Sequence, residues 1–396
     1  MDIKALHTDL EELFPKMVEI RRDLHRHPEL AYQEVRTAKI IADYLENLGI
    51  EVRTKVGGNG VVGTLKGGKP GKTVAIRADF DALPIQDEKD VEYKSTIPNV
   101  MHACGHDGHT ATLLGIATVL AKHRDELEGT VVFLHQHAEE AIGGAAPMIE
   151  DGCLEGVDVV FGTHLSSTES VGGIYIRSGY MMAATDGFEV TINGKGGHGA
   201  SPHETVDPLV IGSQLVMNLQ QIVSRNVDPI ESAVLTVGSF HSGKASNVIP
   251  DTAKITGTVR TYVPEIRDLM EKRITQLANT VCQGNGATCE IKYHRGYDAV
   301  WNHPAETTYI EDIAAEAIGE NNVIESPPLM GGEDFGYFMQ KVPGTFFFTG
   351  GAMDDANLVF PHHHPRFDFN EEAMKVAGKV LLSAVAKANE AEIGKK

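Results

Sequence analysis

Five polar clusters along the chain combine residue types that bind divalent metal ions and activate water. They are Arg77-Ala-Asp79-Phe-Asp81, MHACGHDGH at 101–109, HQHAEE at 135–140, His164 and PHHHP at 361–365. One thiolate, several imidazoles and a carboxylate suit a borderline-soft divalent ion such as zinc. Two adjacent glutamates allow one to bind an ion while its neighbour acts as general base. The clusters together predict metal-assisted hydrolysis.

Each cluster has an ordinary structural explanation when it is taken alone. A histidine at a strand end is more often a hydrogen-bonded structural residue, and a glutamate pair is usually a solvated face. A buried cysteine usually packs as a small apolar residue. The functional interpretation rests on co-location, because all five clusters lie at or just after predicted strand ends, where an α/β sheet carries its active site.

The elements that must position these clusters alternate between strand and helix. Strands are predicted at TVAIRAD (73–79), TVVFLHQ (130–136), VDVVFGTH (157–164) and GTFFFTG (344–350), with helices over about 108–123 and 145–150. Such alternation predicts an α/β fold with a central sheet flanked by helices. Two glycine-rich stretches, 58–63 and 71–73, resemble nucleotide motifs, but a strand follows each where a helix N-terminus is needed. We therefore predict a hairpin at 58–63 and no nucleotide site.

The pattern changes after about Ala184. Residues 184–295 read β-α-β-β-α-β, a ferredoxin-like α+β unit of a size that is normal for an inserted domain. The α/β pattern then resumes. We therefore predict a catalytic domain with a central mixed sheet, split into residues 1–183 and 296–396 by the insertion at 184–295.

The bulk composition limits the partners and the compartment. A formal charge of −20 disfavours binding to nucleic acid and to anionic membranes. No run of about 18 apolar residues occurs, so no membrane span is expected. The first residues lack the blocks of a signal peptide, and the four cysteines form no recognisable disulfide framework. A reducing cytoplasm is the expected location.

Several stretches, in the same order, resemble the amidohydrolase branch of the aminoacylase and carboxypeptidase G metallopeptidase family. That branch includes hippurate hydrolases, auxin-conjugate hydrolases and N-acetyl-diaminopimelate deacetylases. The resemblance runs from Arg21 to Asp368 and rests on RRDLHRHPEL, IRADFDALP, MHACGHDGHT, HAEE, GTHL, GGHGASPH, SNVIPD, GEDF and HHPRFD.

The resemblance implies two divalent ions per subunit, zinc or manganese with cobalt or nickel as alternatives, and a set of residues that hold them. The implied ligands are Cys104, His106, Glu140, His164 and His363. His363 fits the family's His-x-Pro pattern because Pro365 fixes the register, and His362 and His364 are the alternatives. Glu139 would be the base that activates water. Asp79 would support the ligands without binding metal, since the family's usual His-x-Asp pair is Arg77-Ala-Asp79 here. His137 stands where the family pattern leads us to expect proline.

By the same resemblance the inserted domain is a lid and dimerisation domain, and the chain is expected to form a homodimer through it. His198 would stabilise the oxyanion, while Asn247 and Arg260 would contact the polar end of a small N-acyl amino acid substrate. Their alternative interpretations are a turn histidine, a turn amide and a strand-face charge. The expected activity is hydrolysis of N-acyl amino acids. The alternatives are a dipeptidase or carboxypeptidase of the same family, or a metal-stabilised binding protein without catalysis.

Overall fold

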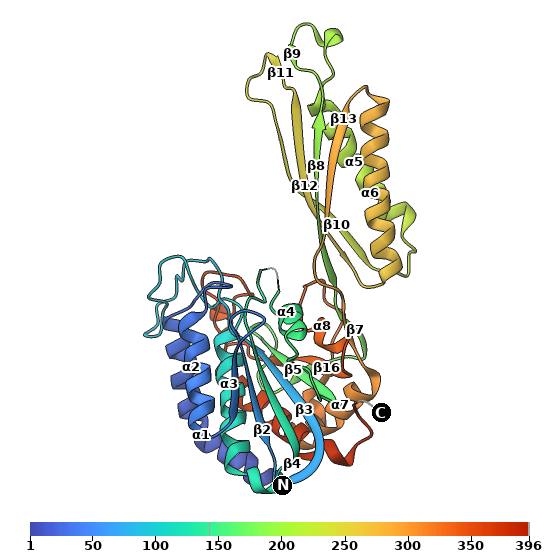
Figure 1. Ribbon diagram of the computed structural model, residues 1–396. Coiled ribbons are helices and arrows are strands. Elements are labelled where there is room, and N and C mark those ends of the chain that lie inside the picture. Colours follow the sequence, from blue (N-terminus) through green and yellow to red (C-terminus); the bar gives the residue numbers. More distant parts are fainter. Residues whose placement is uncertain (142, 395–396) are drawn as a thin grey trace. The chain divides into compact units, whose positions relative to one another are not determined.

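The computed structural model describes residues 1–141 and 143–394, and these residues form two compact units (Figure 1). The first unit comprises Met1–Met181, Val300–Pro328 and the chain from Asp334 onward. The second unit comprises Met182–Ala299 together with the short segment Leu329–Glu333. The first unit is therefore divided in sequence by the second. Leu329–Glu333 is a part of the second unit that the sequence pattern did not indicate.

A mixed sheet of eight strands, counted over the described residues, forms the centre of the first unit. Its spatial order is β1-β2-β4-β3-β5-β16-β6-β15. The strands are β1 (Glu51–Val56), β2 (Gly60–Lys66), β3 (Lys69–Asp79), β4 (Glu128–Gln136), β5 (Val159–Ser166), β6 (Ile174–Ile176), β15 (Val323–Glu325) and β16 (Gly344–Gly350). Four neighbours, β4, β3, β5 and β16, run parallel to one another. β7 (Gly179–Met182) and β14 (Val300–Asn302) pair separately.

Helices flank this sheet, and α3 is the one that lies deepest. The helices of the unit are α1 (Ile3–Arg26), α2 (Val35–Asn47), α3 (His106–Lys122), α4 (Ala145–Glu150), α7 (Pro304–Ile318), α8 (Gly336–Met339) and α9 (Glu372–Lys387). α3 packs against β3 on one side and against α1 and α9 on the other. Its residues are accordingly buried on nearly every face. They are mostly apolar after the first turn, while the first turn carries the polar His106, Asp107 and His109. The core is thus packed directly behind the sheet edge where α3 begins.

The second unit is a four-stranded antiparallel sheet covered by two helices, within residues 182–299, all of which are described. Its elements are β8 (Ala184–Asn193), α5 (Pro208–Asn226), β10 (Ala233–Ser242), β12 (Thr252–Thr261), α6 (Pro264–Gly284) and β13 (Thr288–Arg295), in the spatial order β10-β12-β8-β13. Buried and partly exposed residues alternate along β8, so one face meets the helices. A small ribbon of β9 (Gly197–His198) and β11 (Val248–Ile249) projects from the sheet (Figure 1).

The predicted fold class is confirmed: a split α/β domain with a central mixed sheet and an inserted ferredoxin-like unit. GTFFFTG forms β16 and the helix at 145–150 forms α4 with the predicted bounds. The short strands β6, β7, β14 and β15 were not predicted, because three or four residues are too few to show a period. Within the described residues, no helix is both long and apolar enough to cross a bilayer.

Candidate metal centre

The parallel strands β4, β3, β5 and β16 bring the predicted clusters to one edge of the sheet. Because these strands run in the same direction, their carboxyl ends meet at that edge. Asp79 is the last residue of β3, the HAEE segment follows β4, and His164 lies near the end of β5. The PHHHP segment follows β16 after ten residues. The edge therefore collects residues that are up to 286 positions apart in sequence, between Asp79 and Pro365.

The turn into α3 directs Cys104 and His106 to one point. Gly105 lies between them with a φ of 92°, a left-handed conformation that a side chain would strain. The ligand atoms of Cys104, His106 and Glu140 all lie within 4.8 Å of one another. A thiolate, an imidazole and a carboxylate are thus close enough to share an ion.

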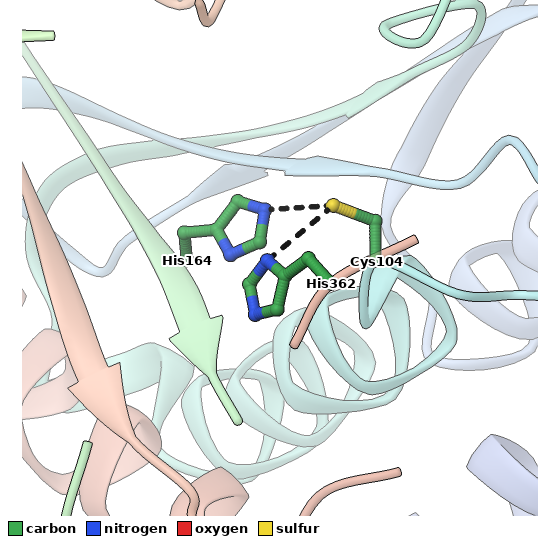
Figure 2. Close-up of side chains that lie close together, drawn as sticks. All are labelled: Cys104, His164 and His362. Carbon is green, nitrogen blue, oxygen red and sulfur yellow. Dashed lines mark hydrogen bonds between the residues drawn. The ribbon is translucent and has the colours of Figure 1, made fainter. Parts of the chain in front are cut away.

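Cys104 also belongs to a second group of three, formed with His164 and His362 (Figure 2). Its Sγ lies 3.4 Å from Nε2 of His164 and 3.7 Å from Nδ1 of His362. Next to the first group, Nε2 of His363 lies 3.2 Å from Oε1 of Glu140. One sulfur atom therefore stands between two sets of metal-binding side chains, an arrangement that fits two neighbouring ions.

Backbone hydrogen bonds determine which histidines have an Nε2 lone pair available to bind a metal ion. The Nδ1 atoms of His106 and His164 face the carbonyl oxygens of Asp81 and Leu165, so each must carry its proton there. Their Nε2 lone pairs then point into the site. His109 and His362 instead accept a backbone N–H at Nε2, from Leu165 and Ser167. In its neutral form the Nδ1 of each therefore carries the proton and acts as a donor.

The site has an unpaired nitrogen that a bound cation would satisfy. Nε2 of His106 is buried without a hydrogen-bond partner, while the buried Oε1 of Glu140 lies 3.2 Å from Nε2 of His363. Burial, and then the charges of Glu140 and Glu139, raise the pKa of the Cys104 thiol well above its usual range. A cation would reverse this effect, because it stabilises the thiolate. Glu139 is itself buried, and one of its carboxylate oxygens lies within 4.8 Å of a carboxylate oxygen of Asp334. The donor set therefore fits divalent metal ions.

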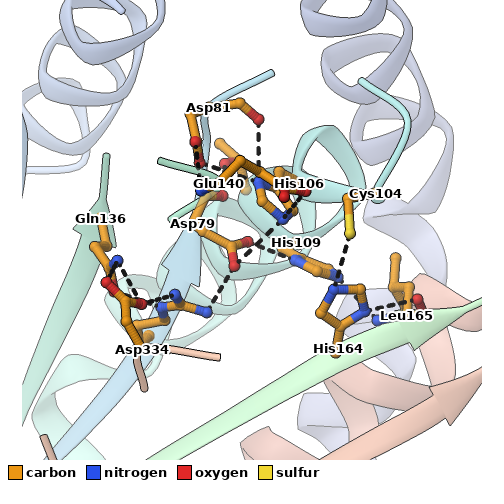
Figure 3. Close-up of polar contacts among 12 residues, drawn as sticks. Asp79, Asp81, Cys104, His106, His109, Gln136, Glu140, His164, Leu165 and Asp334 are labelled. Carbon is orange, nitrogen blue, oxygen red and sulfur yellow. Dashed lines mark hydrogen bonds and ion pairs between the residues drawn. The ribbon is translucent and has the colours of Figure 1, made fainter. Parts of the chain in front are cut away.

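Carboxylates behind the site hold the ligands in orientation (Figure 3). Asp81 accepts from Nδ1 of His106 at 3.2 Å with one oxygen and from the backbone N–H of Glu140 at 2.9 Å with the other. Asp79 accepts from His109 and from Arg77, each at 2.6 Å. Although burial opposes it, Arg77 with the neighbouring histidines holds the pKa of Asp79 well below its usual range. Both Asp79 oxygens are engaged, which favours the supporting role predicted for it.

Sequence reasoning assigned no role to Asp81 or His109, although both stand in stretches that carried the resemblance. Asp81 follows Asp79 by two residues, and His109 follows His106 by three, one turn along α3. The i to i+3 spacing on a helix was a usable signal for His109, because such residues share a face. No sequence signal pointed to Asp81 as the partner of His106, since that contact depends on how β3 meets α3.

The other three predicted residues lie in the second unit. His198 is exposed on β9, opposite Val248 of β11, and its Nδ1 accepts from the N–H of Ala200 at 3.0 Å. Asn247 adjoins β11 and its carbonyl accepts from the N–H of Gly199, so the two predicted residues share one ribbon. Arg260 lies on β12 and donates to the carbonyl of Val259. Their roles towards substrate remain predictions.

Comparison with known proteins identifies the family. The profile of peptidase family M20/M25/M40 matches residues 75–387. The chain is 55% identical to YhaA of Bacillus subtilis, a protein named as an amidohydrolase, over 96% of each sequence. It is 40% identical to thermostable carboxypeptidase 1 of Saccharolobus solfataricus over 94% of this chain and 95% of that one. It is also 40% identical to the N-acetyl-L-cysteine deacetylase of B. subtilis, over 95% of this chain and 89% of that one.

A solved structure agrees with these relatives. The YXEP protein of B. subtilis, described as a dinuclear metal binding peptidase from the M20 family, has a TM-score of 0.81 to this chain. It is 36% identical and the match covers 98% of this chain and 99% of that one. The chain therefore belongs to peptidase family M20/M25/M40. It is a metallohydrolase of this family that acts on amide bonds.

Proposed function

We propose that the protein hydrolyses N-acyl amino acids to a free amino acid and a carboxylic acid, with two divalent ions per subunit. The observation that carries this proposal is the position of Cys104, whose sulfur lies near His106 and Glu140 in one group and near His164 in another. Cys104 would then contribute to holding both of the ions that two-metal hydrolysis requires.

Cys104, His106, Glu140, His164 and His363 are the proposed ligands. His363 is preferred to His362 because the N–H of Ser167 donates to Nε2 of His362. With that nitrogen engaged, the neutral His362 donates from Nδ1 towards the Cys104 sulfur and has no lone pair for an ion. Zinc suits a set of one thiolate, three imidazoles and one carboxylate, and manganese, cobalt or nickel are the alternatives.

The ions would supply Lewis acidity that polarises the scissile carbonyl and lowers the pKa of the attacking water. Glu139 accepts the proton of that water as its oxygen bonds to the carbonyl carbon. Glu139 then delivers the proton to the amide nitrogen as the C–N bond breaks, so that the amino acid leaves as the amine. His198 donates a hydrogen bond to the oxyanion during the addition. Asn247 and Arg260 bind the carboxylate of the amino acid.

The substrate class is tested with a panel of N-acetyl and N-benzoyl amino acids and dipeptides that share the same C-terminal residue. We expect kcat/KM to be at least about tenfold higher for the best N-acyl amino acid, because a free α-ammonium near two cations is repelled. Metal-stripped protein assayed on the same panel is the control. A preference for dipeptides would instead favour the second candidate, a peptidase activity like that in the name of the S. solfataricus relative.

We also propose that the inserted unit forms the dimer contact and delivers His198 to a site. We propose that segments 183–185 and 296–298 act as hinges. They are hydrogen-bonded to each other: the N–H of Thr185 donates to the carbonyl of Tyr297, and its carbonyl accepts from the N–H of Gly296. A paired crossover can transmit a rotation of the unit as a whole. The glycines that flank His198 leave its ring exposed and ready to contact substrate.

His198→Ala is expected to lower kcat by about 10²–10³-fold, the usual cost of one lost oxyanion donor. Metal content and the unfolding temperature should stay at wild-type values, because the side chain lies on an exposed ribbon. His203→Ala, at another exposed histidine of the same unit, is the matched control and should retain full turnover. Wild-type kcat in His198→Ala would contradict the oxyanion role.

A further inference from the structure

A buried carboxylate away from the metal-binding groups lies beneath the loop that carries Glu139. Glu34 is fully buried and occupies the N-cap position of α2, yet its side chain makes no capping hydrogen bond there. Glu29 caps the helix instead, with its two carboxylate oxygens accepting from the N–H groups of Arg36 and Thr37 at 3.0 and 2.8 Å. The Glu34 carboxylate therefore does not cap α2 and is available for other hydrogen bonds.

Glu34 directs this carboxylate to the residue before the proposed base. Its Oε1 accepts from the backbone N–H of Ala138 at 3.0 Å. Ala138 has a φ of 55°, a left-handed conformation that costs free energy for any residue with a side chain. Glu139 follows directly, so the direction in which its side chain leaves the backbone depends on this turn.

The second oxygen of Glu34 accepts from Nδ2 of Asn59 at 2.9 Å. Asn59 lies in the turn between β1 and β2, within the glycine-rich stretch that resembles a nucleotide motif. Gly58 has a φ of 132°, and a Cβ there would lie 2.6 Å from Nε2 of His137. The glycine therefore permits the tip of the hairpin to lie close to the end of β4. This close approach explains why the turn is glycine-rich, although no nucleotide site was predicted there.

The two glutamates of the pair are held separately. Asp81 fixes the N–H of Glu140, while Glu34 fixes the N–H of Ala138 on the other side of Glu139. Burial raises the pKa of Glu34 above its usual value, so placing a carboxylate here costs folding free energy. A group that is unfavourable for stability and is bonded next to the base indicates a positional role.

We infer that Glu34, supported by Asn59, is a positioning residue that sets the orientation of Glu139 through the backbone of Ala138. The inference rests on the proposed function, in which Glu139 is the general base. The inference distinguishes the roles of the two glutamates. Loss of Glu34 should impair the base Glu139, and so lower kcat, more than it impairs the metal ligand Glu140.

Glu34→Ala tests this inference, with Glu306→Ala as the matched control. Glu306 is also a buried glutamate that accepts a backbone N–H, from Gly394, on α7. We expect Glu34→Ala to lower kcat per folded molecule by about 10²-fold with KM within about threefold, because a displacement of about 1 Å at a reacting group has that effect. Glu306→Ala should lose stability and keep its kcat. Metal content should stay at wild-type values in both.

Two further variants keep the test valid if Glu34→Ala fails to fold. Glu34→Gln retains an oxygen for the Ala138 N–H, and the Asn59 amide can rotate to meet the new donor, so kcat should recover to within about tenfold of wild type. Asn59→Ala removes one of the two hydrogen bonds and should lower kcat by about threefold to tenfold. Wild-type kcat in Asn59→Ala, together with a kcat in Glu34→Gln no higher than in Glu34→Ala, would overturn the inference. An equal loss of kcat in Glu306→Ala would also overturn it.

A readout independent of catalysis separates this inference from the proposed function. In metal-free protein, the amides of residues 138–140 should exchange with solvent faster in Glu34→Ala than in wild type, while those of α7 stay unchanged. The inference is contradicted if the amides of residues 138–140 exchange no faster in Glu34→Ala than in wild type, or if they exchange faster only in Glu306→Ala. If wild-type protein hydrolyses no amide with any metal, the proposed function fails, while the exchange result still decides whether Glu34 holds the loop.

Discussion

Removal of divalent ions with a chelator is expected to abolish amide hydrolysis, and addition of zinc or manganese is expected to restore it. The physical reason is the donor set around Cys104: without a cation, the thiol is held protonated and the Nε2 of His106 stays unpaired. Without bound ions, nothing in the proposed mechanism polarises the carbonyl or lowers the pKa of the attacking water. The loss should exceed that from any single substitution, because in the proposed mechanism both ions would contribute to the same step.

The measurement pairs turnover with metal content by mass spectrometry as ions are added back. Activity should rise until about two ions are bound per subunit, and the unfolding temperature should rise with it, since ions that bind only the folded chain stabilise it. Full turnover in protein shown to contain no metal would contradict the central claim. If activity reaches its maximum at one bound ion per subunit, the group of Cys104 and His164 does not hold a second ion that catalysis requires.

Glu139→Gln is expected to retain both ions and to lower kcat by about 10²–10⁴-fold, the usual contribution of general-base catalysis. Glutamine has nearly the same shape but no basic carboxylate, so it cannot accept the proton of the attacking water. Glu140→Gln should instead lower metal content, because Glu140 lies within 4.8 Å of Cys104 and His106 and next to His363.

The comparison of the two glutamates distinguishes base from ligand. Glu12→Gln, in the adjacent Glu11-Glu12 pair on α1, is the control, and it should change neither metal content nor kcat. If Glu139→Gln loses metal while Glu140→Gln keeps it, the two roles are reversed. If neither variant loses turnover, the HAEE segment is a structural turn and the proposed mechanism is wrong.

The sequence by itself determined the fold class and the types of residue at the site. Strand and helix periods reflect which faces are buried, and this local pattern was enough to identify β3, β4, β5 and β16 and the inserted β-α-β-β-α-β unit. Because parallel strands end at a common edge, it also followed that the HAEE segment after β4 and His164 near the end of β5 would lie at one edge of the sheet. These inferences need only the pattern along the chain.

Only the tertiary structure decided which atom of each side chain is free to act. The sequence alone does not show which ring nitrogen is available in His106, His109, His164 and His362. Hydrogen bonds from distant segments decide this: Nε2 is unpaired in His106, whereas in His362 it accepts the N–H of Ser167. The same holds for Asp81 and Glu34, whose partners Glu140 and Ala138 are 59 and 104 residues away. A hydrogen bond depends on distances of a few tenths of an ångström and on angle. Such precision arises from packing between elements, and no local pattern in the sequence carries it.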